Sequence, residues 1–169
     1  LMEKKFFLVF QPVVDLKKGT VSHYEVLIRM RGIDNEVVSP GEFISVAERM
    51  GLIHSIDLWV VKEAIDFLAN LPSGMSHISL AINLSSMAFQ DESLLPAIKE
   101  KLELTWVDAK RITFEITETA AIENFEKTRD MITKIRALGC QFALDDFGAG
   151  FCSFNYLKTF PVDYVKIDA

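Results

Sequence analysis

Five strand-like stretches of the sequence each place a polar residue among apolar neighbours. Successive side chains of a strand point to opposite faces, so each polar group would face away from the residues beside it. If helices cover the apolar faces, the polar groups converge on one shared side. The five positions are Glu25, Asn83, Glu115, Asp145 (followed by Asp146) and Lys166.

These residue types together indicate a metal site. Carboxylates gathered inside a fold repel one another and lose hydration unless a cation lies among them. Carboxylate and amide oxygens are hard ligands, which Mg²⁺ and Mn²⁺ prefer. A lysine that points inward among acids also fits a site better than an ordinary surface position. The sequence therefore predicts a divalent-metal site with Lys166 beside it.

The elements that must position these residues alternate between strand and helix. A tight turn at residues 17–19 predicts that the first two strands pair antiparallel. Ser39, Pro40 and Glu42 form a helix start with a capping box, and Gly51 ends that helix. The predicted strands are 6–16, 21–30, 78–85, 112–118, 141–147 and 164–168, and the predicted helices lie within 39–51, 56–68, 94–102, 125–139 and 154–158.

This order of elements predicts an α/β fold with a mostly parallel sheet. In an open doubly wound sheet the strands are apolar on both faces, whereas here one face carries ionisable groups. We therefore expect a TIM-like (β/α) barrel whose inner face leads to the site. A complete barrel takes about 250 residues. This chain has 169 residues and six predicted strands, so we expect one domain over residues 1–169 with an incomplete barrel.

Composition excludes other classes. The net charge is −6 and there is no basic run, which argues against a binder of nucleic-acid polymers. Cys140 and Cys152 have no metal-ligand spacing and indicate unpaired thiols in a reducing compartment. No apolar run approaches the roughly 20 residues of a membrane span. We expect a cytoplasmic protein or the cytoplasmic domain of a membrane-anchored one.

Six short motifs occur in a characteristic order. They are Gln-Pro at 11–12, Glu-Val-Leu-Ile-Arg at 25–29, Asn-Leu-Ser at 83–85, Phe-Glu-Ile-Thr-Glu at 114–118, Asp-Asp-Phe-Gly-Ala-Gly at 145–150 and Lys-Ile-Asp at 166–168. In order and approximate spacing the chain resembles the EAL-domain family of bacterial cyclic di-GMP phosphodiesterases. The resemblance covers essentially the whole chain. It implies a modified TIM barrel with an antiparallel first strand, here lacking its last strands and helices.

The resemblance implies a role for each matching residue. Glu25, Asn83, Glu115 and Asp145 match the ligands of one divalent cation, Mg²⁺ or Mn²⁺. Asp146 matches a residue that helps to hold a second cation and orients the attacking water.

Four further positions also match the family. Lys166 would lie beside the scissile phosphate and complete a catalytic set with Asp146 and Glu25. Gln11 and Arg29 match residues that contact the dinucleotide, and the planar, permanently charged fork of Arg29 suits a phosphate. Glu118 matches an anchor of the loop after Asp146, in which glycines allow backbone angles closed to other residues.

The implied activity is metal-dependent hydrolysis of cyclic di-GMP to linear pGpG in bacterial second-messenger signalling. The family also implies a homodimer, formed through the helix after the acidic loop, and fusion to sensory or diguanylate-cyclase domains. A late glutamate and a late glutamine of the family pattern are absent, so the active site is expected to be incomplete in this chain.

Two other function classes stay open. One is a non-catalytic EAL-like receptor of cyclic di-GMP, although such a module would not need the metal ligands that this sequence has. The other is a different metal-dependent barrel enzyme, such as an enolate-forming one. That class would not predict Gln11-Pro12 or the Asp-Asp-Phe-Gly sequence at 145–148.

Overall fold

A hairpin of two long strands begins the fold. The computed structural model describes residues 5–148 and 158–168, and within them β1 and β2 pair antiparallel, as predicted. From β2 onward the order β2-β4-β5-β6-β7 is parallel at every step, and β3 pairs antiparallel with β2 outside this path. The strands are β1 (Phe6–Asp15), β2 (Thr20–Arg31), β3 (Val37–Val38), β4 (Leu80–Asn83), β5 (Ile112–Thr117), β6 (Gln141–Phe147) and β7 (Tyr164–Ile167).

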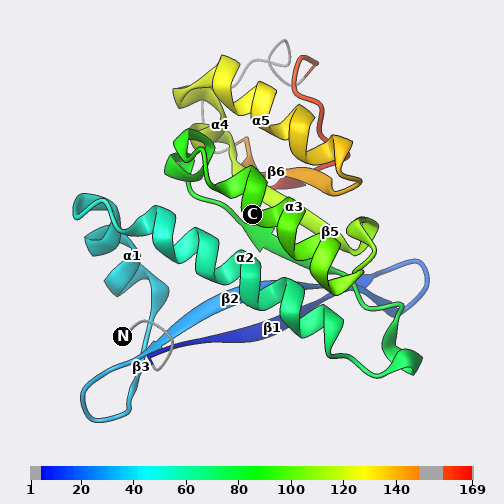
Figure 1. The fold of residues 1–169 in the computed structure, drawn as a ribbon, viewed down its shortest axis with the longest axis horizontal. Coiled ribbons are helices and arrows are strands. Elements are labelled where there is room, and N and C mark those ends of the chain that lie inside the picture. The colour runs from blue at the N-terminus through cyan, green and yellow to red at the C-terminus, as the bar shows by residue number, and fades with distance from the viewer. Residues whose placement is uncertain (1–4, 149–157, 169) are drawn as a thin grey trace.

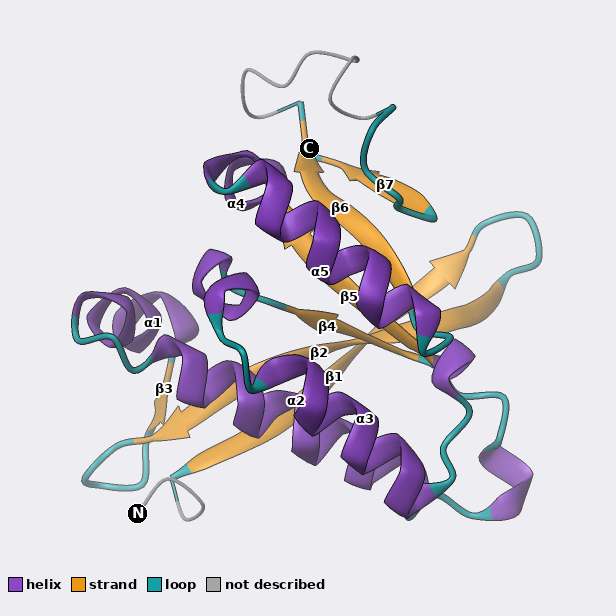
Figure 2. Cartoon of the chain, turned by 45° about the horizontal axis from the view of Figure 1, so that its top comes forward, coloured by secondary structure: helices purple, strands orange, loops and turns teal. Residues whose placement is uncertain are grey.

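The long helices lie together on one side of this sheet, and α2, α3 and α5 follow one another across it (Figures 1 and 2). This arrangement follows from parallel pairing, which needs a crossover connection between successive strands. The helices are α1 (Pro40–Arg49), α2 (Ile53–Ala69), α3 (Leu94–Thr105), α4 (Glu118–Glu123) and α5 (Phe125–Ala137), with 3-10 turns η2 (Ser73–Met75), η3 (Ser86–Gln90) and η4 (Ala109–Arg111).

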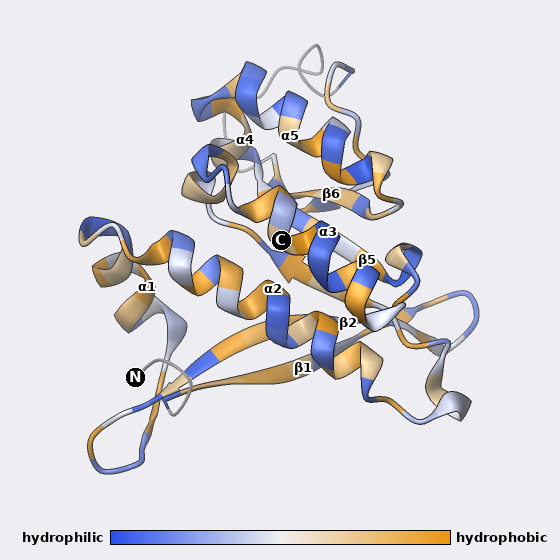
Figure 3. Ribbon diagram, in the orientation of Figure 1, coloured by the Kyte–Doolittle hydropathy of each residue, from blue (hydrophilic) through white to orange (hydrophobic). Residues whose placement is uncertain are grey.

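The core lies between the helices and one face of the sheet. Eight apolar strand residues on this face are at most 3% exposed, and they pack against apolar residues of α2, α3 and α5. Figure 3 shows hydrophobic residues on the helices and strands of this layer. The strand residues concerned are Val26, Leu80, Ile82, Ile112, Phe114, Ile116, Phe142 and Leu144. Because side chains alternate along a strand, their polar neighbours must occupy the opposite face.

Several element predictions need correction. Glu118 is not the end of a strand but the first residue of α4, because the Thr117 side chain accepts a hydrogen bond from the backbone N of Ala120 and caps a helix there. The two-residue strand β3 was not predicted, so the described residues form seven strands rather than six. β4 covers only four residues of the predicted strand 78–85.

Some predictions lie outside the described residues. They are the helix 154–158 except its last residue, the thiol of Cys152, and the dimer contacts after the acidic loop. Within the part of the chain that the structure describes, no helix is both long and apolar enough to cross a membrane.

One acid is buried among the apolar residues of α2. Asp57 is 6% exposed, although the other buried residues of this helix are all apolar. Both its carboxylate oxygens accept hydrogen bonds from Ser85, at 2.5 Å from the hydroxyl and 3.3 Å from the backbone N. Burial raises the pKa of Asp57 to about 6, and the hydrogen bonds from Ser85 oppose that rise.

We expect this raised pKa to make stability depend on pH. Folded Asp57 binds a proton more tightly than unfolded Asp57, whose ordinary pKa is 3.8. Its contribution to the free energy of unfolding therefore falls as pH rises through about 4 to 6. Relative to wild type, the free energy of unfolding of Asp57→Asn should rise by about 2 kcal/mol between pH 4 and pH 7. Urea unfolding of both proteins across this range measures the difference, and parallel stability curves would contradict the expectation.

Candidate active site

Strand register brings the predicted site residues onto the face of the sheet opposite the helices. Asn83, the last residue of β4, pairs with Glu115 of β5, and Asp145 of β6 pairs with Thr117 of β5. Glu25 of β2 pairs in parallel with β4 two residues before Asn83. Residues in register on neighbouring strands point to the same face. The predicted convergence of these polar groups is therefore confirmed.

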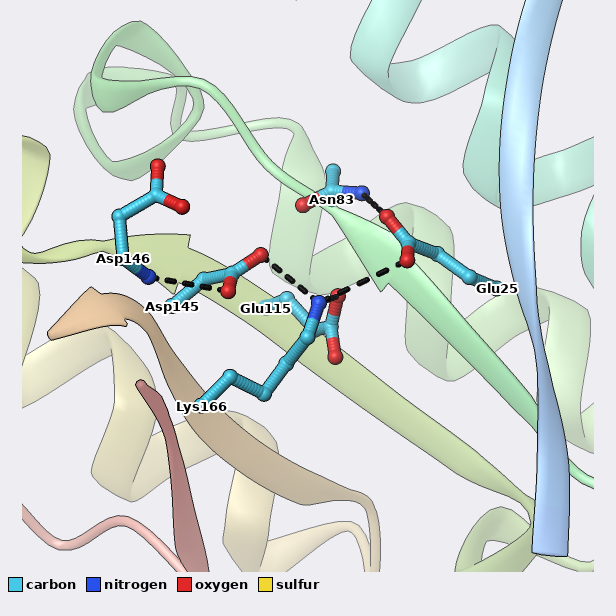
Figure 4. A network of polar contacts seen from close by, with 6 residues as sticks. All are labelled: Glu25, Asn83, Glu115, Asp145, Asp146 and Lys166. Atoms are coloured by element: carbon cyan, nitrogen blue, oxygen red, sulfur yellow. Dashed lines mark hydrogen bonds and ion pairs between the residues drawn. The ribbon is translucent and has the colours of Figure 1, made fainter. Parts of the chain in front are cut away.

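The ammonium group of Lys166 lies among three carboxylates. Its Nζ is 2.8 Å from Oε2 of Glu115, 2.8 Å from Oδ2 of Asp145 and 3.6 Å from Oε2 of Glu25 (Figure 4). One oxygen of each acid lies within 4.8 Å of the others, a spacing that could hold a metal ion. Asn83 completes the group, because its Nδ2 donates a 2.8 Å hydrogen bond to Oε1 of Glu25.

Burial sets the electrostatics of this cluster. The Glu115 side chain is fully buried, and this burial raises the pKa of its carboxyl while the hydrogen bond from Lys166 opposes the rise. For Lys166, burial alone would lower the pKa, but the hydrogen bonds to Asp145 and Glu115 raise it above its ordinary value. The lysine is thus held in its charged form. One cation faces three acids, so the ionised cluster keeps an excess of negative charge.

One oxygen of the cluster fits a further cation. Oε1 of Glu115 is buried and has no hydrogen-bond partner among the described residues. A buried carboxylate oxygen without a partner is costly. Glu25, Glu115 and Asp145 each also offer a carboxylate oxygen to a group of the hard donor kind that Mg²⁺ and Mn²⁺ accept. The residues present therefore fit the predicted metal.

Asp146 lies beside this cluster but outside the group of three acids. Its backbone has a φ of +53°, which few non-glycine residues adopt, and its N donates to Oδ1 of Asp145 at 2.9 Å. The Asp146 carboxylate points away from Lys166 (Figure 4). Burial and the neighbouring charge of Asp145 raise the pKa of Asp146. Its role at a second cation stays a prediction.

The other predicted residues lie along the same face or at its edge. Gln11 pairs with Glu25 across the β1-β2 ladder, and Arg29 lies four residues beyond Glu25 on the same face of β2. Nη1 of Arg29 donates to the carbonyl oxygen of Ile28. The roles of both residues in binding the dinucleotide stay predictions.

Glu118 contacts the loop that follows the acidic pair. It is 2% exposed, and its Oε2 accepts a 2.8 Å hydrogen bond from the backbone N of Gly148. Gly148 has a φ of +102°, a conformation that side chains strongly disfavour. The role of Glu118 as an anchor of the rest of this loop stays a prediction.

Sequence reasoning missed the contact between Asp57 and Ser85. The available signal was an acid placed on the apolar face of the second predicted helix, between Ile56 and Val60. The partner could not be inferred, because Ser85 lies 28 residues further along the chain.

Comparison with known proteins agrees with the geometry. The EAL domain family model matches residues 1–169. The chain is 36% identical over 168 residues to the cyclic di-GMP phosphodiesterase PdeF of Escherichia coli (strain K12) and 36% identical over 167 residues to the cyclic di-GMP phosphodiesterase PdeB of Shewanella oneidensis. These matches cover 99% and 98% of this chain, but only 22% and 20% of the two relatives.

A solved structure is similar in fold. The c-di-GMP complex of the phosphodiesterase PaMucR matches with a TM-score of 0.91 and 29% identity, over 99% of this chain and 68% of that chain. The chain thus spans about a fifth of the length of these two curated relatives and about two thirds of this solved structure. The described sheet and helices are an incomplete TIM-like barrel, and the chain belongs to the EAL-domain family.

Proposed function

We propose that the chain forms the larger part of a phosphodiesterase domain that hydrolyses cyclic di-GMP to linear pGpG in bacterial second-messenger signalling. The observation that carries the proposal is the cluster of Glu25, Glu115 and Asp145 with Lys166 among them. Phosphodiester hydrolysis needs positive charge beside the phosphate, and a divalent cation held by these acids would supply it. Two relatives named cyclic di-GMP phosphodiesterases support the choice of substrate.

The cofactor in this proposal is Mg²⁺ or Mn²⁺, held by Glu25, Asn83, Glu115 and Asp145. Its support is the unpartnered Oε1 of Glu115 and the closeness of the three acids. When bound, such a cation would lower the pKa of a coordinated water to about 7 and offset the charge of the phosphate. Asp146 would help to hold a second cation and orient the attacking water.

The remaining residues have binding and orienting roles in this proposal. Lys166 keeps a positive charge at the cluster and would stabilise charge on the phosphate oxygens. Arg29 would bind a phosphate through its guanidinium fork, and Gln11 would contact the dinucleotide beside Glu25. Glu118 holds the backbone of Gly148 and so fixes the start of the loop after Asp146.

We infer a cytoplasmic domain that forms a homodimer and is joined to sensory or diguanylate-cyclase domains. The small share of the curated relatives that this chain covers supports such additional domains.

The activity test is turnover of cyclic di-GMP by the intact protein with Mn²⁺, followed by chromatography of pGpG. We expect Glu115→Gln to lower turnover at least about 100-fold, because it removes a buried charged ligand from the cluster. Glu103→Gln, on the exposed surface of α3, is the matched control and should leave turnover unchanged. Tight binding of cyclic di-GMP without cleavage by wild type would instead identify a receptor.

A second test concerns the charge balance of the cluster. We expect Lys166→Met to lower the free energy of unfolding by about 2–4 kcal/mol at pH 7 in EDTA, because it leaves three acids unpaired. Lys101→Met is the matched control: it removes a more exposed ion pair with Asp66 and should cost about 1 kcal/mol or less. Urea unfolding gives both values, and equal losses would contradict the assigned role of Lys166.

A further inference from the structure

The chain leaves the sheet immediately after Asn83, and this turn is tightly fixed. The next residue, Leu84, is buried, and its backbone N donates a 2.9 Å hydrogen bond to the carbonyl oxygen of Glu115. Ser85 then caps η3, because its Oγ accepts a 3.3 Å hydrogen bond from the backbone N of Ala88. The direction of the Asn83 side chain depends on how this turn is held.

Asp57 holds the same turn from the helix layer. Its Oδ2 accepts the hydroxyl proton of Ser85 at 2.5 Å, and its Oδ1 lies 3.3 Å from the Ser85 backbone N. The Ser85 hydroxyl therefore donates to Asp57 while it accepts from Ala88. One carboxylate joins α2 to the end of β4, two residues from Asn83.

Packing alone does not account for an acid at this place. The buried positions around Asp57 on α2 are Ile53, Ile56, Val60 and Val61. A carboxylate buried there costs free energy unless it is fully hydrogen-bonded, and an apolar side chain would avoid that cost. Asp57 provides directional contacts that an apolar side chain cannot make, because its two oxygens hold both the backbone and the side chain of Ser85 in place.

We propose that Asp57 is a positioning residue that, through Ser85, holds the Asn83 amide against Glu25 and thereby sets the affinity of the cluster for a divalent cation. The proposal rests on the metal site of the proposed function. Asn83 Nδ2 lies 2.8 Å from Oε1 of Glu25, so a shift of the turn would move the Asn83 amide and weaken its hydrogen bond to the Glu25 carboxylate. Residues that orient metal ligands from outside typically change metal affinity or activity about 10–100-fold when they are altered.

The experiment is titration of the intact protein with Mn²⁺ alone, followed by calorimetry or electron paramagnetic resonance at pH 8. Asp57→Asn keeps the size of the side chain but cannot accept both hydrogen bonds with the same strength, and Ser85→Ala removes the hydroxyl. We expect each variant to bind Mn²⁺ about 10–100-fold more weakly. The double variant should be no weaker than the worse single one, because both changes break one contact.

Two control variants separate positioning from a general structural role. Asp66 lies on the same helix as Asp57 but contacts Lys101, which is remote from the turn. Asp66→Asn breaks that contact and should leave Mn²⁺ affinity unchanged. Ser85→Thr keeps the hydroxyl and should bind Mn²⁺ more tightly than Ser85→Ala. At saturating Mn²⁺, the turnover of cyclic di-GMP by Asp57→Asn should approach that of wild type.

The possible results separate a failure of the positioning role from a failure of the metal site. Folded Asp57→Asn that binds Mn²⁺ as tightly as wild type would overturn the positioning role and leave the metal site intact. Equal weakening by Asp66→Asn would also overturn it, because the effect would then reflect the stability of α2 in general. Wild type that binds no Mn²⁺ would overturn the metal site of the proposed function, and the positioning role with it.

Discussion

The neutralisation of acids on one face of the sheet is the interaction on which the site depends. Glu25, Glu115 and Asp145 come from three different strands, and a fourth strand supplies the ammonium group of Lys166. Without a cation, these carboxylates would repel one another across a distance of a few ångströms. The positive charge of Lys166 offsets part of this repulsion. The three acids still carry more negative charge than the lysine neutralises, which favours the binding of a divalent cation.

The architecture follows from separating this face from the core. The apolar residues of β4, β5 and β6 lie under α2, α3 and α5, so the helices bury one side of the sheet, and the candidate site lies on the other side. Links between the two layers then matter for the site. The contact from Asp57 to Ser85 is such a link, because it joins the packed helix layer to the turn that follows Asn83.

Much of the fold could be predicted from local patterns. Alternation along each strand correctly assigned Glu25, Glu115, Asp145 and Lys166 to one face, and the short turn at 17–19 correctly indicated an antiparallel pair. The errors were also local. The predicted strand 112–118 is one residue too long, because Thr117 is both the last residue of β5 and the cap of α4, and Glu118 already belongs to the helix.

The sequence by itself determined the residue types, the face to which each points and the family to which the chain belongs. Each of these depends on neighbouring residues or on motif order along the chain. Only the tertiary structure decided which individual side chains are in direct contact. Lys166 contacts Glu115 across 51 residues, and Asp57 contacts Ser85 across 28. Such contacts depend on strand register and helix packing, which many distant residues fix together and no short pattern encodes.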